Sequence, residues 1–306
     1  MVATGALVTT TTPLLVTSAA SAAHPRAIPA YTIRLEDQIL AELRYLPVEF
    51  VPAGATTTPP TTTTSTTTTT TSTTTTVPTN GSGATTTTPT TTTPPTTTTT
   101  VPTRRRPTRS IDPAMMRRGS FTWRFPTLPA SFKRNWSVGT DNVILRGALM
   151  RFQMDHGLIA TGSMDGATWR LLVETVRARK FSSEPYTMVL VSQTLPQRLD
   201  LYQNGRVTFT TLVNTGIPAS PTANGTFPVY LRFTSTTMSG TNPNGTHYHD
   251  TGIPWVSYFN GGDALHGFIR PGYGYPQSLG CVEMPFAEAK ALWVHTPIGT
   301  LVTVQP

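Results

Sequence analysis

The chain has 306 residues, a formal net charge of +8 at pH 7 and a single cysteine, and only 12% of its residues are charged. The length suffices for two small domains with linkers, and the cysteine has no intramolecular disulfide partner. Because basic and aromatic residues are not interleaved, the positive charge fits an anionic cell-wall polymer better than nucleic acid.

Residues 1–30 are predicted to be an export signal and a disordered N-terminus. A weak apolar segment, interrupted at Thr9–Thr12, precedes the small residues Ser-Ala-Ala of a cleavage region. The segment lacks basic residues at its start, so a trimmed or misassigned start is an alternative. No stretch of about 20 apolar residues follows, so we expect an exported protein without a membrane span.

Residues 31–52 are predicted to hold one amphipathic helix, within Thr32 to Phe50 and with its stop at Pro47. Leu35, Ile39, Leu43 and Leu46 recur at helical spacing before Pro47. A lone helix of this length is marginal in water, so its apolar face requires a partner later in the chain.

Residues 53–110 consist almost entirely of Thr, Pro, Ser and Gly and end in Arg104 to Arg106. Such a segment has too few apolar side chains to offset the entropy of ordering, which predicts a disordered tract open to O-glycosylation. The arginines are interpreted as a solvated linker end, with electrostatic tethering to wall polymers as the alternative.

Residues 111–180 regain helical periodicity. One helical face carries Leu145, Ala148, Leu149 and Phe152 and ends at Gly157, and a second helix begins at Asp165 with Trp169 and Leu172 inward. The run from Arg146 to Leu172 resembles the peptidoglycan-binding domain, which has three helices. The helix at Leu35 to Leu46 is expected to supply the missing first one, which makes the Thr-rich tract an insertion within that domain.

Residues 184–306 change to a strand-like pattern. Arg198–Gln203 and Arg206–Val213 flank Asn204-Gly205, a strong hairpin signal, and further strands are expected at Tyr186–Ser192, Val229–Ser235, Trp255–Phe259 and Leu301–Val304. A late helix is predicted at Pro285–His295. The segment Thr236–Pro254, rich in Gly, Asn and Thr, is predicted to be a mobile loop across a cleft.

The only cysteine, Cys281, is a candidate nucleophile. Its ordinary pKa of about 8.5 leaves little thiolate at neutral pH, so a base is required, and His266 precedes it across Gly- and Pro-rich turns that allow the chain to fold back. The backbone N–H groups of Gly280 and Cys281 are candidate oxyanion donors. The alternative is a buried structural cysteine beside a core histidine.

These residues resemble the L,D-transpeptidase catalytic domain, and the similarity covers about residues 184–306. His266-Gly267, Ser278, Gly280-Cys281 and Val282 match its motif, whereas Leu279 stands in place of a histidine and Glu283 in place of Arg or Asn. The resemblance implies that Cys281 is acylated, that His266 is its base, that the Gly267 carbonyl orients the imidazole, and that Ser278 belongs to the site loop. The negative charge of Glu283 is expected to raise the pKa of the thiol.

Four residues are candidates to line the substrate groove: Met238, Tyr248, Trp255 and Tyr258. Ordinary loop packing is the alternative for each. His247 and His249 suggest a metal pair, but no third ligand lies in sequence range, so we expect neither a metal nor another cofactor.

The sequence thus predicts an α+β protein of two domains, a small three-helix peptidoglycan-binding-like domain and a mainly β catalytic domain built as a sandwich or barrel. By resemblance its partners are donor and acceptor peptidoglycan stem peptides, which it would cross-link in cell wall biogenesis. The alternatives are an L,D-carboxypeptidase, transfer of the stem to a protein amine, a catalytically degenerate wall-binding module and, least favoured, a conventional cysteine hydrolase.

Overall fold

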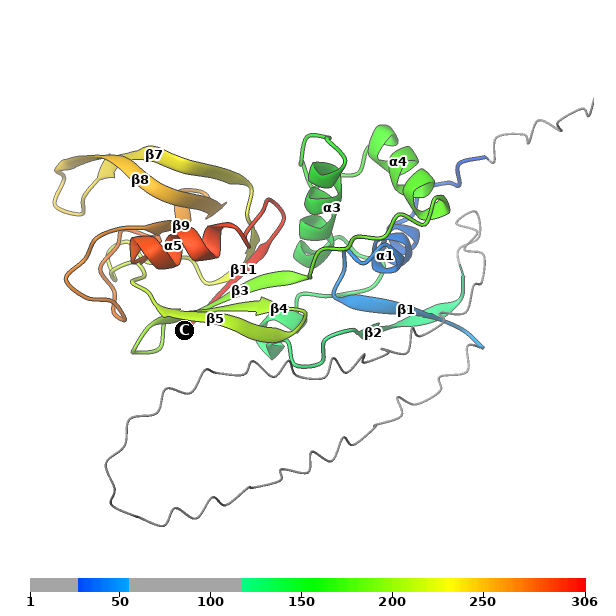
Figure 1. Cartoon of the computed structure of the whole chain (residues 1–306), viewed down its shortest axis with the longest axis horizontal. Helices are drawn as coiled ribbons and strands as arrows, with labels where there is room; N and C mark the ends of the chain where they lie inside the picture. Colours follow the sequence, from blue (N-terminus) through cyan, green and yellow to red (C-terminus); the bar gives the residue numbers. More distant parts are fainter. Residues whose placement is uncertain (1–26, 55–116) are drawn as a thin grey trace, which may run out of the picture.

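The computed structural model describes residues 27–54 and 117–306. The predicted export signal and the Thr-rich tract therefore fall almost wholly outside the described residues. Within the described ranges, a group of helices adjoins a β-rich region (Figure 1).

Three of the helices assemble around one core. They are α1 (Ile33–Glu42), α3 (Val143–Asp155) and α4 (Gly166–Arg177), each with a side-chain N-cap, at Thr32, Asn142 and Asp165 respectively. Leu35, Ile39, Phe152, Trp169 and Leu172 belong to a single buried cluster. The first helix therefore packs against the two that lie more than 100 residues later in the chain, as its apolar face requires.

The predicted helix, with its stop at Pro47, is too long at its C-terminal end. The helix ends at Glu42, and Val48–Pro52 forms strand β1, which pairs antiparallel with β2 (Gly119–Trp123). Beyond this ladder the Ala53 N–H donates to the Arg118 carbonyl at 2.8 Å. A short helix, α2 (Ala130–Lys133), follows β2.

The C-terminal region contains two sheets. The first has the strand order β5 (Arg206–Leu212), β4 (Arg198–Gln203), β3 (Thr187–Ser192), β11 (Leu301–Gln305), β6 (Gly225–Pro228). The second has the order β10 (Val282–Met284), β9 (Asp263–Gly267), β8 (His247–Asn260), β7 (Leu231–Thr241), and helix α5 (Phe286–Trp293) packs against β8 and β9.

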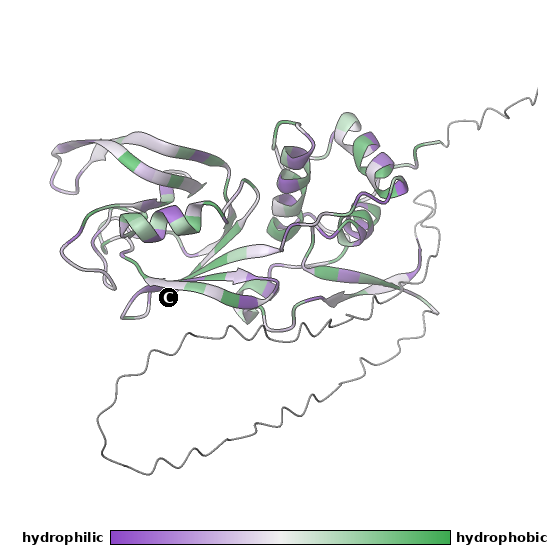
Figure 2. Ribbon diagram, viewed as in Figure 1, coloured by the Kyte–Doolittle hydropathy of each residue, from purple (hydrophilic) through white to green (hydrophobic). Residues whose placement is uncertain are grey.

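Apolar side chains of both sheets and of α5 meet in one core. Val189 and Leu201 of the first sheet share a buried cluster with Leu265 and Val282 of the second and with Leu292 of α5. The green segments on the central strands and on α5 follow this core (Figure 2). The predictions of a mainly β region, of the hairpin at Asn204-Gly205 and of the late helix are confirmed.

The predicted loop at Thr236–Pro254 is instead most of a long hairpin. Strands β7 and β8 pair from Leu231↔Tyr258 to Thr241↔His247, and only residues 242–246 turn. Most side chains of β7 are exposed, so the strand lacks the apolar alternation by which strands are recognised.

The helices are joined tightly to the β-rich region. Met188 and Leu301 of the sheets belong to the same cluster as the helix residues, and α3 approaches the backbone at Gly299 closely. In the described ranges, no helix is long and apolar enough to cross a membrane.

Candidate active site

Cys281 lies at the end of the loop that connects β9 to the start of β10. It is partly buried, and with Met238, Tyr258 and Phe268 it packs around Ile253, Val256 and Ala264. Its Sγ donates to the Gly262 carbonyl at 3.6 Å. The thiol therefore sits in a largely apolar setting beside the β8–β9 turn.

His266 occupies the adjacent strand. Strand alternation places its side chain on the same face of β9 as Ala264, around which Cys281 packs, and the parallel register sets His266 opposite Glu283, two residues after the cysteine. The imidazole is 3% exposed, and its Nδ1 lies 3.0 Å from the Gly267 carbonyl. When Nδ1 donates to this carbonyl, Nε2 keeps a free lone pair that can accept a proton.

Burial shifts both groups towards their neutral forms. Burial above all, together with the charges of Asp263 and Glu283 and against the opposing effect of the Ala264 N–H, raises the pKa of Cys281 to about 12. Burial also lowers the pKa of His266. The resting site therefore holds a thiol and a neutral imidazole, so proton transfer must accompany nucleophilic attack.

The site loop is held by Ser278. Its hydroxyl donates to the Cys281 carbonyl at 2.5 Å and accepts the Gly280 N–H at 3.2 Å. Since the Gly280 N–H is engaged in this way, the expected pair of backbone oxyanion donors is not preformed, and the Cys281 N–H is the remaining candidate.

Three of the four predicted groove residues gather near the thiol. Met238 and Tyr258 pack in the cluster with Cys281, and burial followed by the charge of Cys281 raises the pKa of Tyr248. Trp255 does not join them. Its ring is partly buried, packs edge-on against Trp293 of α5 with centroids 5.7 Å apart, and contacts the core between the sheets.

The two histidines of the β7–β8 hairpin have local partners. His247 Nδ1 lies 3.1 Å from Thr241 Oγ1, and His249 Nδ1 lies 2.8 Å from Ser239 Oγ. In the part of the chain that the structure describes, no three His, Cys, Asp or Glu side chains form a group that could hold a metal ion.

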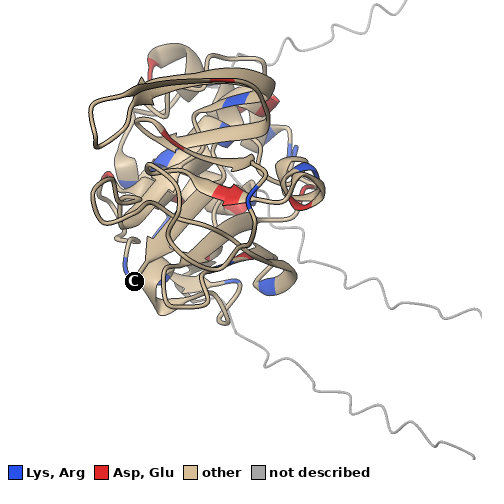
Figure 3. Ribbon diagram, turned by 90° about the vertical axis from the view of Figure 1, so that its left-hand side faces the viewer, with Lys and Arg blue, Asp and Glu red and all other residues tan. Residues whose placement is uncertain are grey.

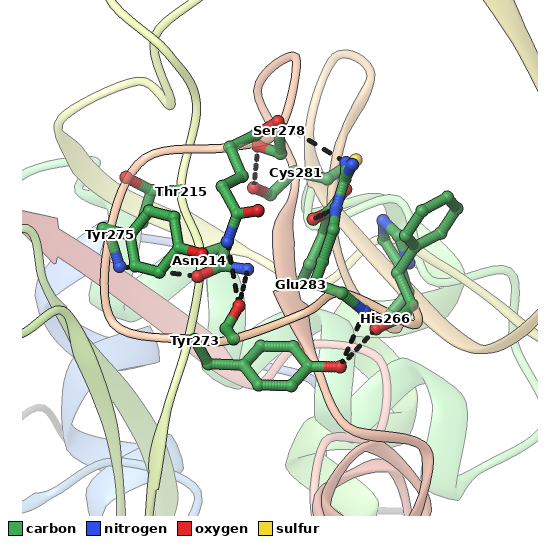
Figure 4. A network of polar contacts seen from close by, with 12 residues as sticks. Asn214, Thr215, His266, Tyr273, Tyr275, Ser278, Cys281 and Glu283 are labelled. Atoms are coloured by element: carbon green, nitrogen blue, oxygen red, sulfur yellow. Dashed lines mark hydrogen bonds and ion pairs between the residues drawn. The ribbon is translucent and has the colours of Figure 1, made fainter.

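Two residues at the site were not predicted from the sequence. Arg270 forms a bidentate ion pair with Glu283, and the buried Asn214 binds the loop between His266 and Cys281 through its side chain (Figure 4). The only signal for the first was an isolated arginine in a Gly- and Pro-rich loop near an isolated glutamate. Nothing in the sequence pattern marked the second.

Comparison with known families gives a match for the β-rich region. Residues 186–304 match the YkuD family, the L,D-transpeptidase catalytic domain. The match does not extend over helices α1 to α4, so the peptidoglycan-binding-like domain stays a prediction. No curated protein matches the chain.

Several solved structures are similar in part. The catalytic domain of an E. faecium L,D-transpeptidase is 27% identical over 40% of this chain and 100% of its own, with a TM-score of 0.36. An L,D-transpeptidase from Mycobacterium smegmatis is 18% identical over 41% of this chain and 61% of its own, with a TM-score of 0.36. L,D-transpeptidase 3 from Mycobacterium tuberculosis, in complex with a faropenem-derived adduct, is 19% identical, with 41% and 63% covered and a TM-score of 0.37. The chain thus spans less than two thirds of either mycobacterial protein.

Proposed function

We propose that the chain is a peptidoglycan L,D-transpeptidase that acts through a Cys281 acyl-enzyme. The observation that carries the proposal is the placement of the only cysteine beside β9 on the face that bears His266, in a region that matches the L,D-transpeptidase catalytic domain. The imidazole held by the Gly267 carbonyl supports the assignment of His266 as the base.

The reaction begins when the thiol leaves the Gly262 carbonyl and gives its proton to His266 Nε2. The sulfur attacks the carbonyl carbon before the terminal D-residue of a donor stem, and the Cys281 N–H donates to the oxyanion. The amine of the leaving D-residue takes the proton back from His266 as the C–N bond breaks. An acceptor amine on a second stem then attacks the thioester, its proton passes to His266, and the thiol is restored as the new amide forms.

The helices serve this reaction as a second contact with the wall. A peptidoglycan-binding-like domain fixed to the catalytic region raises the local concentration of stem peptides. The basic net charge supports contact with anionic wall polymers, and we place the protein outside the cytoplasm, at the cell wall.

The test is intact-protein mass spectrometry after incubation with a carbapenem, whose strained carbonyl takes the place of the stem carbonyl. We expect one adduct on the wild-type chain and none on Cys281→Ala. The matched control is Ser220→Ala, which removes a hydroxyl that donates to the Leu279 carbonyl in the same loop and leaves the thiol in place. An adduct on Cys281→Ala would exclude Cys281 as the nucleophile.

Product analysis then separates the remaining alternatives. Incubation with disaccharide-tetrapeptides gives cross-linked dimers from a transpeptidase but shortened stems from an L,D-carboxypeptidase. Binding to sacculi without an adduct or a product would identify a degenerate wall-binding module.

A further inference from the structure

A buried carboxylate adjoins the two candidate catalytic residues. Glu283 is on β10, opposite His266 and two residues after Cys281, and only 4% of it is exposed. Its two oxygens accept from Arg270, at 2.7 Å from Nε and 2.8 Å from an Nη. Such a bidentate ion pair fixes the orientation of both side chains, and a buried carboxylate without this partner would destabilise the folded state.

Arg270 connects several points of the loop that links His266 to Cys281. Its guanidinium stacks on the Phe268 ring, 4.6 Å from the centroid, and donates to the Gln277 carbonyl at 3.4 Å. Its backbone N–H donates to the Tyr273 hydroxyl, which in turn donates to the Phe268 carbonyl. The ion pair therefore ties the beginning and the end of this loop to β10.

The opposite side of Glu283 is also held. Its backbone N–H and carbonyl both bond to the backbone of Asn214 at 2.9 Å. The Asn214 side chain donates to the Gly272 carbonyl and accepts the Gly274 N–H, as Figure 4 shows. With the loop fixed here and at Arg270, the sulfur and the imidazole are held on adjacent strands.

The pair also places two opposite charges beside the reacting groups. Charged residues are sparse on the side of the molecule that Figure 3 shows. Burial above all, and the charge of Arg270, lower the pKa of His266, whereas the Gly267 carbonyl and the charges of Glu283 and Asp250 raise it. Towards Cys281, burial, Asp263 and Glu283 raise the pKa, the Ala264 N–H lowers it, and Tyr248 and Tyr258 lie close by. Removal of one partner therefore leaves an uncompensated charge at the site.

We propose that Arg270 and Glu283 are a positioning pair that anchors the loop carrying Cys281 to the strand beside His266 and keeps the charge there balanced. The assignment of the two reacting residues rests on the proposed function. The proposed pair also means that Glu283, the acidic residue in the motif, is part of a working site and does not mark a degenerate one.

The test compares Arg270→Gln, Glu283→Gln, the double variant and Arg270→Lys with the wild type. Two rates are measured from about pH 5 to about pH 10, alkylation of Cys281 by iodoacetamide and acylation by a carbapenem. The matched control is Arg151→Gln, because the Arg151 side chain is as exposed as that of Arg270, 28% in each case, and also pairs with a carboxylate, but lies on α3.

The two Gln single variants are expected to move the acidic limb of the pH–rate profile of acylation in opposite directions. Without Glu283, the remaining arginine lowers the pKa of His266, so the limb moves about half a unit to one unit towards lower pH, and alkylation shifts the same way. Without Arg270, the limb moves a similar amount towards higher pH, and the rate at neutral pH falls about tenfold or more because the loop loses its anchor. The double variant recovers the wild-type pH dependence but not the rate, and Arg151→Gln matches the wild type.

Profiles of Glu283→Gln and Arg270→Gln that coincide with the wild type would overturn the proposal. If Arg270→Gln does not fold, Glu283→Gln and Arg270→Lys decide it. The lysine keeps the positive charge but cannot form the bidentate hydrogen bond to Glu283. An Arg270→Lys variant with the wild-type pH dependence of acylation and a reduced rate therefore supports the pair, and an unchanged rate refutes it. Alkylation needs no transpeptidase activity, so shifted alkylation profiles without any carbapenem adduct would refute the proposed function and leave the pair intact.

Discussion

At the scale of single residues, Gly280 is the position beside the thiol that tolerates a side chain least. Its φ is +120°, a region that residues with a Cβ avoid, and a Cβ there would lie 2.5 Å from Asp263 Oδ1. Asp263 cannot retreat freely, because Oδ2 of its carboxylate accepts from the Ala223 N–H and the Asn260 amide. A methyl group at position 280 must therefore displace the backbone next to Cys281.

We predict that Gly280→Ala lowers the rate of carbapenem acylation about a hundredfold, since displacements of about 1 Å have such effects on catalysis. The measurement is the acylation rate by mass spectrometry. Gly262→Ala is the matched control. The Gly262 carbonyl accepts the hydrogen bond of the thiol, yet a Cβ at this position has nothing within 4 Å, so the variant should be acylated at the wild-type rate. Equal acylation rates in the two variants would show that the backbone at Gly280 does not determine the position of the Cys281 thiol.

The same scale shows what sequence alone could and could not predict about the site. Cys281 and His266 stand out because His266-Gly267, Ser278 and Gly280-Cys281 resemble the L,D-transpeptidase motif in type and spacing, whereas a lone cysteine and a lone histidine would by themselves be read as structural. The sequence also predicted that Glu283 acts on the thiol, and the rise in the pKa of Cys281 includes its contribution. Its partner Arg270 was not predictable, because their pairing depends on the path of the intervening loop, which no periodicity encodes.

At the scale of elements, the contact of α3 with the β-rich region depends on a glycine within the helix. A Cβ on Gly147 would lie 2.8 Å from the Gly299 carbonyl and 2.8 Å from Leu301 Cδ2. Alanine inside a helix is normally more stable than glycine by about 0.5 to 1 kcal/mol. Here the helix would have to move away from the sheet, so the sign of the effect should reverse.

We predict that Gly147→Ala destabilises the protein by about 1 to 3 kcal/mol, as overpacking against backbone does. Urea unfolding followed by tryptophan fluorescence measures this change. Gly166→Ala is the matched helical control, because a Cβ there has nothing within 4 Å, and we expect it to be neutral or stabilising. A stabilised Gly147→Ala would mean that the helix and the sheet are not rigidly joined.

Elements were predictable where a local signal specified them. The helices α3 and α4 carry both a capping residue and an apolar face, and the β4–β5 hairpin carries Asn-Gly at its turn. The hairpin of β7 and β8 also carries Asn-Gly at its turn, at Asn244-Gly245, but its outer strand has no apolar face because most of its length is exposed. Strand β1 was missed since 66 residues, 53–118, separate it from its partner β2, and pairing over that distance leaves no local pattern.

At the scale of the whole molecule, the paired strands β1 and β2 flank the Thr-rich tract. Their ladder runs from Val48↔Trp123 to Pro52↔Gly119, and the bond from Ala53 to Arg118 continues it. The preceding helix α1 shares its core with α3 and α4. These contacts support the proposal that the tract is an insertion within one folded unit and not a linker between two units.

An insertion of this kind can be removed without loss of the fold. We predict that deletion of residues 56–110, which leaves enough chain to connect Gly54 with Arg117, preserves cooperative unfolding and carbapenem acylation. The shorter loop should also raise the free energy of unfolding by about 1 to 2 kcal/mol, because closing a shorter loop costs less conformational entropy. Thermal unfolding and the acylation rate measure the two effects.

The control for this deletion is removal of residues 27–54, which takes away α1 and β1. That chain loses Leu35, Ile39, Leu40, Leu43 and Leu46, all of which are buried in the core that α3 and α4 share. Each such leucine or isoleucine contributes about 2 to 3 kcal/mol when fully buried, so the helices should no longer fold cooperatively. If both deletions unfolded alike, the tract itself would contribute to the fold. If neither did, the first helix would belong to no common unit, and the segments on either side of the tract would be separate modules.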